Sequence, residues 1–180
     1  MFGNLFRYLL PLLGAGLLTL AACGNDDDAD DNATAAGDGT VTWTSNGQTH
    51  TSTVFSSAIV DSPDKIIITG GSADQKNIVS LSLLGIGTKG AATYDLRKGS
   101  VLDNLPAGVV TLTTSGTTGS IYNSLYGPAA SNGTITVTQY DKAGQKISGT
   151  FSFTAGALPN TGATGNQSVT NGSFSLTKFR

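Results

Sequence analysis

One six-residue pattern occurs four times in the chain: glycine, hydroxyl, apolar, hydroxyl, apolar, threonine. The copies are GTVTWT from Gly39, GTITVT from Gly133, GTFSFT from Gly149 and GSFSLT from Gly172. Alternation with a period of two places one set of side chains in a dry interior and the other set in water. Because the copies follow one another at no fixed interval, the pattern indicates similar half-buried antiparallel strands rather than a repeat protein.

The composition favours the same kind of structure. The chain has 24 Gly, 25 Thr and no Glu. Thr, Val, Ile and aromatic residues suit strands, whereas Glu, Lys, Leu and Ala build helices. Past residue 22 no long window has helical periodicity, and short alternating runs are separated by turn-rich segments. About nine or ten short strands of this kind predict a single all-β domain over residues 40–180.

We expect this domain to be an antiparallel β-sandwich rather than a barrel. Its inward-facing positions include several Phe and Leu residues, which are large enough to fill the space between two sheets. Besides the four hexapeptides, strands are expected at Lys65–Thr69, Asn77–Leu84, Ala91–Asp95, Val109–Thr113 and Ile121–Tyr126.

Two hairpins can be specified further. Asn46-Gly47 between alternating runs is typical of a two-residue type I′ turn, and such a turn places Trp43, the only tryptophan, opposite His50, the only histidine. The hairpin that follows GTITVT must keep its apolar residues on one face with those of GTFSFT.

A three-residue loop, Lys142–Gly144, satisfies this condition, because it sets Ile135 opposite Phe151. A four-residue loop beginning at Asp141 would put the two faces out of step. The shorter loop also places Gly144 where a type I turn with a bulge needs a left-handed residue.

Residues 1–22 have the organisation of a signal peptide. Arg7 supplies positive charge, Tyr8–Leu20 is an apolar run too short to span a bilayer comfortably, and small residues follow it. The run ends in Leu-Ala-Ala-Cys, which resembles the lipobox of bacterial lipoproteins. The resemblance implies cleavage before Cys23 and lipidation of Cys23, and several acyl chains make a stable membrane anchor. The open alternative is a secretory signal followed by an unrelated cysteine.

Residues 23–39 are expected to form a flexible tether. Five aspartates crowd between Asp26 and Asp31, and a segment of like charges with little to bury stays extended. An acidic run soon after a lipidated cysteine resembles the surface-export signal of some Gram-negative lipoproteins. The resemblance implies a lipid-anchored protein of the outer membrane, exposed at the cell surface.

The second half of the chain carries a further resemblance. GTITVTQYD, KISGTFSFTA and VTNGSFS occur in this order, and together they resemble a family of small lipoproteins with a domain of unknown function, known chiefly from Bacteroidetes-type bacteria. The resemblance covers roughly residues 40–177. It implies a secreted, lipid-anchored β domain and transfers no catalytic residue.

The charge and residue content argue against several functions. The net charge is −2, so no basic surface is available for nucleic acid. With one His, one Cys and no nucleophile elbow, we expect no enzyme, no metal site and no cofactor. His50 is expected to be a packing partner of Trp43. It would be the starting base of the alternative function, an extracellular hydrolase acting on carbohydrate.

A non-enzymatic binding or structural module is therefore the expected function. The partner would be a glycan or a neighbouring envelope protein, and a plain spacer is the third alternative. Planar aromatic side chains can stack on sugar rings, and Tyr122 and Tyr126 lie in a Gly/Ser-rich segment. We expect these two tyrosines to be the exposed pair that contacts a ligand.

Overall fold

The computed structural model describes residues 37–115 and 118–180, so the predicted signal peptide, Cys23 and most of the predicted tether lie outside the described residues. The described part is nearly all β. Its elements are β1 (Gly39–Ser45), β2 (Gln48–Ser52), β3 (Ser57–Ser62), β4 (Lys65–Gly71), β5 (Asn77–Leu84), α1 (Ile86–Lys89), β6 (Thr93–Arg97), β7 (Ala107–Ser115), β8 (Thr118–Asn123), the 3-10 turn η1 (Ser124–Tyr126), β9 (Ser131–Asp141), β10 (Lys146–Ala157) and β11 (Asn166–Leu176).

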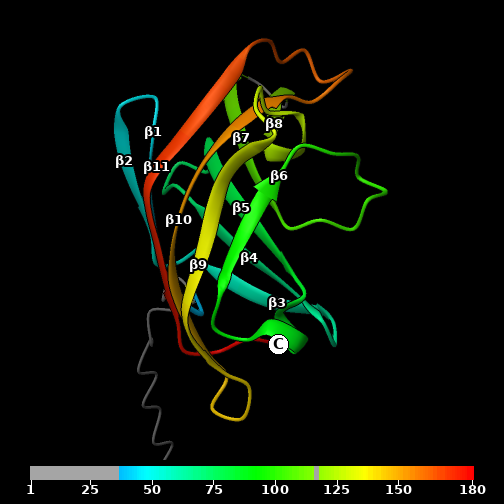
Figure 1. Cartoon of the computed structure of the whole chain (residues 1–180). Helices are drawn as coiled ribbons and strands as arrows, with labels where there is room; N and C mark the ends of the chain where they lie inside the picture. Colours follow the sequence, from blue (N-terminus) through cyan, green and yellow to red (C-terminus); the bar gives the residue numbers. More distant parts are fainter. Residues whose placement is uncertain (1–36, 116–117) are drawn as a thin grey trace, which may run out of the picture. The chain divides into compact units, whose positions relative to one another are not determined.

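The strands form one continuous antiparallel sheet that folds over into two layers. One layer has the order β2-β1-β11-β10-β9-β6 and the other has the order β8-β7-β5-β4-β3. The layers join where Gly156 and Ala157 at the end of β10 pair with β8. In Figure 1, β11, β10, β9 and β6 lie toward the viewer, and β3, β4 and β5 lie behind them. The predicted all-β sandwich is confirmed, with its two layers connected through β10.

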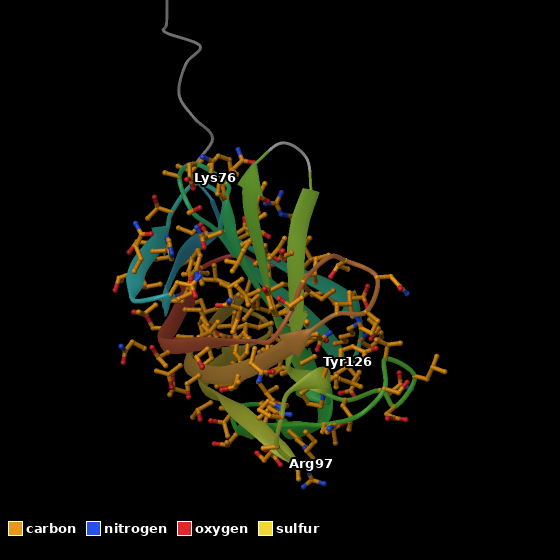
Figure 2. All side chains as sticks on the ribbon, turned by 90° about the horizontal axis from the view of Figure 1, so that it is seen from above. Lys76, Arg97 and Tyr126 are labelled. Atoms are coloured by element: carbon orange, nitrogen blue, oxygen red, sulfur yellow. The ribbon has the colours of Figure 1, made fainter. Side chains whose placement is uncertain are left out.

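The core lies between these layers, and Figure 2 shows side chains filling that space. The apolar positions of all four hexapeptides belong to it, each at most 4% exposed: Val41, Trp43, Ile135, Val137, Phe151, Phe153, Phe174 and Leu176. The hydroxyl residues between them are half-buried or exposed. Alternation in the sequence has therefore become a sheet with one dry face and one wet face.

The glycine that begins each hexapeptide has a packing reason. In all four, the next strand passes so close that a Cβ atom would collide with a backbone carbonyl oxygen. The collisions involve Gly39 with Ser175, Gly133 with Ser152, Gly149 with Thr136, and Gly172 with Phe151. Glycine is the residue that permits such an approach. The glycine of the recurrent pattern is thus explained by close contact between strands, and its other positions are explained by alternation.

The first hairpin has the predicted geometry. Trp43 pairs with His50 across β1 and β2. Asn46 and Gly47 both have positive φ, 52° and 74°, as a type I′ turn requires.

The three-residue loop predicted for the second hairpin is wrong. It has four residues, Lys142–Gln145, and its left-handed residue is Gln145, with a φ of 54°, rather than Gly144. The Asp141 carboxylate accepts a hydrogen bond from the Gly144 N–H at 2.8 Å. A Cβ on Gly144 would collide with that carboxylate. Glycine is needed at position 144 because Asp141 approaches it closely, and not because the turn requires a left-handed residue there.

The core register of this hairpin is nevertheless as predicted, with Ile135 opposite Phe151. The ladder shifts by one residue between Ser148 and Gly149, which leaves Thr138 without a direct partner in the ladder. This bulge restores the face alternation that the longer loop would have broken.

Most other predicted strands are present with shifted bounds, and β3 was missed. Ile59 and Val60 on β3 are 48% and 42% exposed, so apolar side chains stand on both faces and obscure the alternation. Ile121–Tyr126 is a strand only to Asn123, whose side-chain oxygen accepts the Leu125 N–H at 2.9 Å and begins η1.

The folded domain begins before residue 40. Asp38, which the sequence places in the tether, is buried, and its carboxylate contacts the Arg180 guanidinium at 2.9 Å. The same carboxylate accepts the Ala58 N–H at 3.3 Å. Backbone hydrogen bonds also join Arg180 to Ala58 and Val60 of the edge strand β3. Asp38 therefore links the start of β1 to β3 and to residue 180.

Replacing Asp38 by alanine should lower the free energy of unfolding by about 1–3 kcal/mol, because the buried Ala58 N–H loses its charged acceptor. Replacing Arg180 by alanine should cost less, since that side chain is 63% exposed and exposed ion pairs contribute little. Urea unfolding followed by Trp43 fluorescence measures both. Equal losses for the two variants would contradict the role assigned to the buried carboxylate.

Candidate functional site

The outer face of the layer β2-β1-β11-β10-β9-β6 carries a row of hydroxyl side chains. The six residues lie directly opposite one another across all six strands: Thr51, Thr42, Ser173, Thr150, Thr136 and Thr93. We call this surface the hydroxyl face. Some neighbouring side chains are hydrogen-bonded to each other, as the hydroxyl groups of Thr93 and Thr136 are at 3.2 Å. Strands about 4.8 Å apart give the row a regular spacing.

Three shallow hollows lie on the hydroxyl face, with volumes of about 590, 210 and 400 Å³. They share residues: Ser152 lines the first two, Ser168 the last two, and Thr170 all three. They therefore form one connected region, which we call the central depression. It runs from Thr134 on β9 to the Asn46-Gly47 turn.

The central depression lies at an irregularity in β11. The ladder of β11 shifts by one residue against both β1 and β10, and Asn171 there has a positive φ of 51°. A bulge of this kind increases local twist and redirects side chains. Gly172 follows it, and the Phe151 ring lies against Gly172 on the core side of the sheet, where a Cβ atom would collide with it.

The lining of the central depression is uncharged. Every residue that borders the three hollows is a hydroxyl, amide, glycine or apolar residue. Among the described residues, no side-chain hydrogen bond occupies Ser152, Thr170 or Asn171. These groups are free to bind water or a ligand, and hydroxyl and amide groups can both donate and accept.

The two tyrosines chosen from the sequence do not form an exposed pair. Tyr122 is 6% exposed and belongs to the core, because it points inward on β8 opposite Val110. Tyr126 is half-buried in η1 and is labelled in Figure 2. The expected exposure is wrong for Tyr122. A ligand contact by either residue stays a prediction.

His50 packs against Trp43 as expected, with ring centroids 5.2 Å apart. Burial lowers the pKa of His50, and the Asp74 carboxylate partly opposes this shift. Within residues 37–115 and 118–180, His50 makes no hydrogen bond to a carboxylate, and no three His, Cys or Asp residues cluster as metal ligands. The hydrolase alternative thus gains no paired base from the described geometry.

The stability of the domain should fall as the pH is lowered through 6.5. The folded-state pKa of His50 lies below its ordinary value of 6.5, so the unfolded chain binds the proton more readily and protonation favours unfolding. The loss should level off once the pH is below the folded-state pKa. Urea midpoints at pH 5 and pH 7.5 should therefore differ for the wild type and differ less for His50→Gln. Identical midpoints for the wild type would contradict this.

A further hollow lies outside the hydroxyl face. It has a volume of about 170 Å³ and is bordered by the loop between β6 and β7, which projects from the domain in Figure 1. Val101 and Leu102 in this loop are 61% and 84% exposed. Sequence reasoning placed a turn-rich segment between the two strands here but missed both this hollow and the central depression. The alternating hydroxyls were a signal for the latter, although they do not indicate the bulge.

None of the helices in the part of the chain that the structure describes is long and apolar enough to cross a membrane. No curated protein and no solved structure matches the chain. A family model described as a domain of unknown function, DUF6252, matches residues 38–176. The match covers all of β1 to β11 and confirms the expected membership in a family of unknown function. The chain therefore belongs to the DUF6252 family.

Proposed function

We propose that the protein is a lipid-anchored envelope module that binds its partner without catalysis, through the central depression. The observation that carries the binding role is the connected, uncharged depression with unoccupied hydroxyl and amide groups at its centre. Binding sites are concave and place a few polar groups in fixed positions. Here these groups stand on strands, whose backbone is held by ladders on both sides.

The anchor is supported by the sequence Leu-Ala-Ala-Cys at the end of the apolar run. Acylation of Cys23 would hold the domain at the outer membrane, and the acidic tether would present it at the cell surface. One acyl chain binds a membrane only marginally, whereas several chains dissociate very slowly.

Metabolic labelling with a radioactive fatty acid tests the anchor. The wild type should incorporate label, and Cys23→Ala should incorporate none and should leave the membrane fraction. Cys23→Ser is the matched variant for Cys23→Ala, because it keeps a small polar side chain and so isolates the effect of removing the thiol. Equal labelling of the wild type and Cys23→Ala would overturn the anchor. Protease treatment of intact cells then tests surface exposure, since a protein facing the periplasm would stay uncut.

A hydrolase acting on carbohydrate remains the alternative proposal. The central depression has no carboxylate in its lining, whereas glycoside hydrolysis ordinarily uses a pair of carboxyl groups. Incubation of the purified full chain with the polysaccharides that it binds, followed by a reducing-end assay, separates the two proposals. Release of new reducing ends at a rate above that of a heat-unfolded sample would favour the hydrolase.

A further inference from the structure

We propose that the central depression takes an uncharged linear polysaccharide, with Thr170 as its central contact. This inference rests on the proposed function, because it names the chemical class of the partner at the same site. Thr170 is exposed and borders all three hollows. A ligand that lies across the depression must therefore pass over its side chain.

The lining matches an uncharged ligand. Recognition of phosphate, carboxylate or ammonium groups uses charged partners, which make the strongest hydrogen bonds, and a desolvated ion without a partner is costly. No charged side chain borders the central depression. The exposed amides Asn46, Asn166 and Asn171 stand with the hydroxyls. Sugar hydroxyls both donate and accept, as do these groups.

The shape favours a chain of sugars over a single sugar or a protein. The depression crosses β9, β10, β11 and β1, which lie side by side, so it spans about 15 Å at the usual strand spacing. Protein interfaces are organised around buried aromatic or Arg anchors in apolar pockets. Phe151 and Phe153 border the hollows by position, but their side chains are buried in the core at 4% and 3% exposure, so the depression offers no such anchor.

The test uses the full chain in a detergent without a sugar headgroup, because a maltoside would itself resemble the ligand. Immobilised protein is exposed to three neutral polysaccharides (dextran, laminarin and xylan) and to the polyanion alginate. We expect at least one neutral polysaccharide to bind and alginate to bind no better at low salt. Removal of one hydrogen-bonding group should weaken binding about fivefold.

Thr170→Val removes the hydroxyl while it keeps the shape and the β propensity, and Thr170→Ser restores the hydroxyl. Thr93→Val is the matched control, since Thr93 is an exposed threonine of the same hydroxyl face outside the depression. Weaker binding by Thr170→Val alone, recovered by Thr170→Ser, would support the inference.

Three outcomes overturn it: no neutral polysaccharide binds, alginate alone binds, or Thr170→Val binds like the wild type. Circular dichroism and the urea midpoint of each variant show whether the fold is retained, so a folded Thr170→Val protein gives a valid comparison. Acylation of Cys23 is measured separately. An acylated protein that binds no neutral polysaccharide would retain the anchored module of the proposed function and would overturn only the class of ligand.

Discussion

Gly149→Ala is expected to lower the free energy of unfolding by about 3 kcal/mol, a cost at the upper end of that for overpacked positions. A Cβ at this position would collide with the Thr136 carbonyl oxygen and approach the Phe174 ring to 2.6 Å. The carbonyl belongs to the β9 backbone and cannot turn aside as a flexible side chain can. Two strands would have to separate in the middle of a layer, and their ladder would weaken.

Gly162→Ala is the control for Gly149→Ala. Gly162 has a left-handed φ of 69°, and a Cβ at this position would meet no heavy atom within 4 Å. Alanine there has a conformational cost of about 1 kcal/mol and no collision. Urea unfolding followed by the fluorescence of Trp43 measures both variants. A smaller loss for Gly149→Ala than for Gly162→Ala would show that close approach is not the reason for the glycine in the hexapeptide.

Phe153→Ala should be among the most damaging core truncations, with a loss of about 3–5 kcal/mol. Phe153 on β10 is 3% exposed. Its ring lies over Gly108 of β7, in the opposite layer, and packs against Phe151 with centroids 6.3 Å apart. Its removal would leave a cavity where the two layers meet.

Phe55→Ala is the matched control for Phe153→Ala, because Phe55 is 39% exposed and its truncation should cost about 1 kcal/mol or less. Thermal unfolding of the two variants should therefore differ clearly. Similar melting temperatures would mean that the space between the layers is not the core that holds the domain together.

The sequence predicted those features that depend on alternation. Period two identified the buried residues of the four hexapeptides, and the need to bury them predicted that Ile135 lies opposite Phe151. Asn46-Gly47 predicted its turn because both residues tolerate positive φ. The turn signal is local to two residues, and the register follows from the need to keep one face of the sheet dry.

The features that the sequence did not predict depend on contacts between distant residues. The second hairpin combines a longer loop with a bulge at Thr138, and its two deviations cancel in the core register. The carboxylate of Asp38 meets Arg180, 142 residues further along the chain. Tyr122 was chosen for its Gly/Ser-rich neighbours, but alternation along β8 turns it inward.

The candidate site was only partly predictable. Outward hydroxyls follow from the hexapeptides, but the central depression depends on the bulge at Asn171-Gly172, which shifts β11 against two neighbours at once. The sequence shows the Asn-Gly pair and does not show which strands flank it. The spatial convergence on Thr170 therefore required the structure.

Hydroxyl-radical labelling of the folded protein, read by mass spectrometry, most directly tests the division into a dry face and a wet face. The reaction rate of a side chain follows its exposure to water. We expect Leu102, 84% exposed, and Phe55 to be oxidised in the native protein, while Trp43, Phe151 and Phe153 react only after unfolding. Rapid oxidation of Trp43 and Phe151 in the native state would contradict the two-layer core on which the hydroxyl face and its proposed site depend.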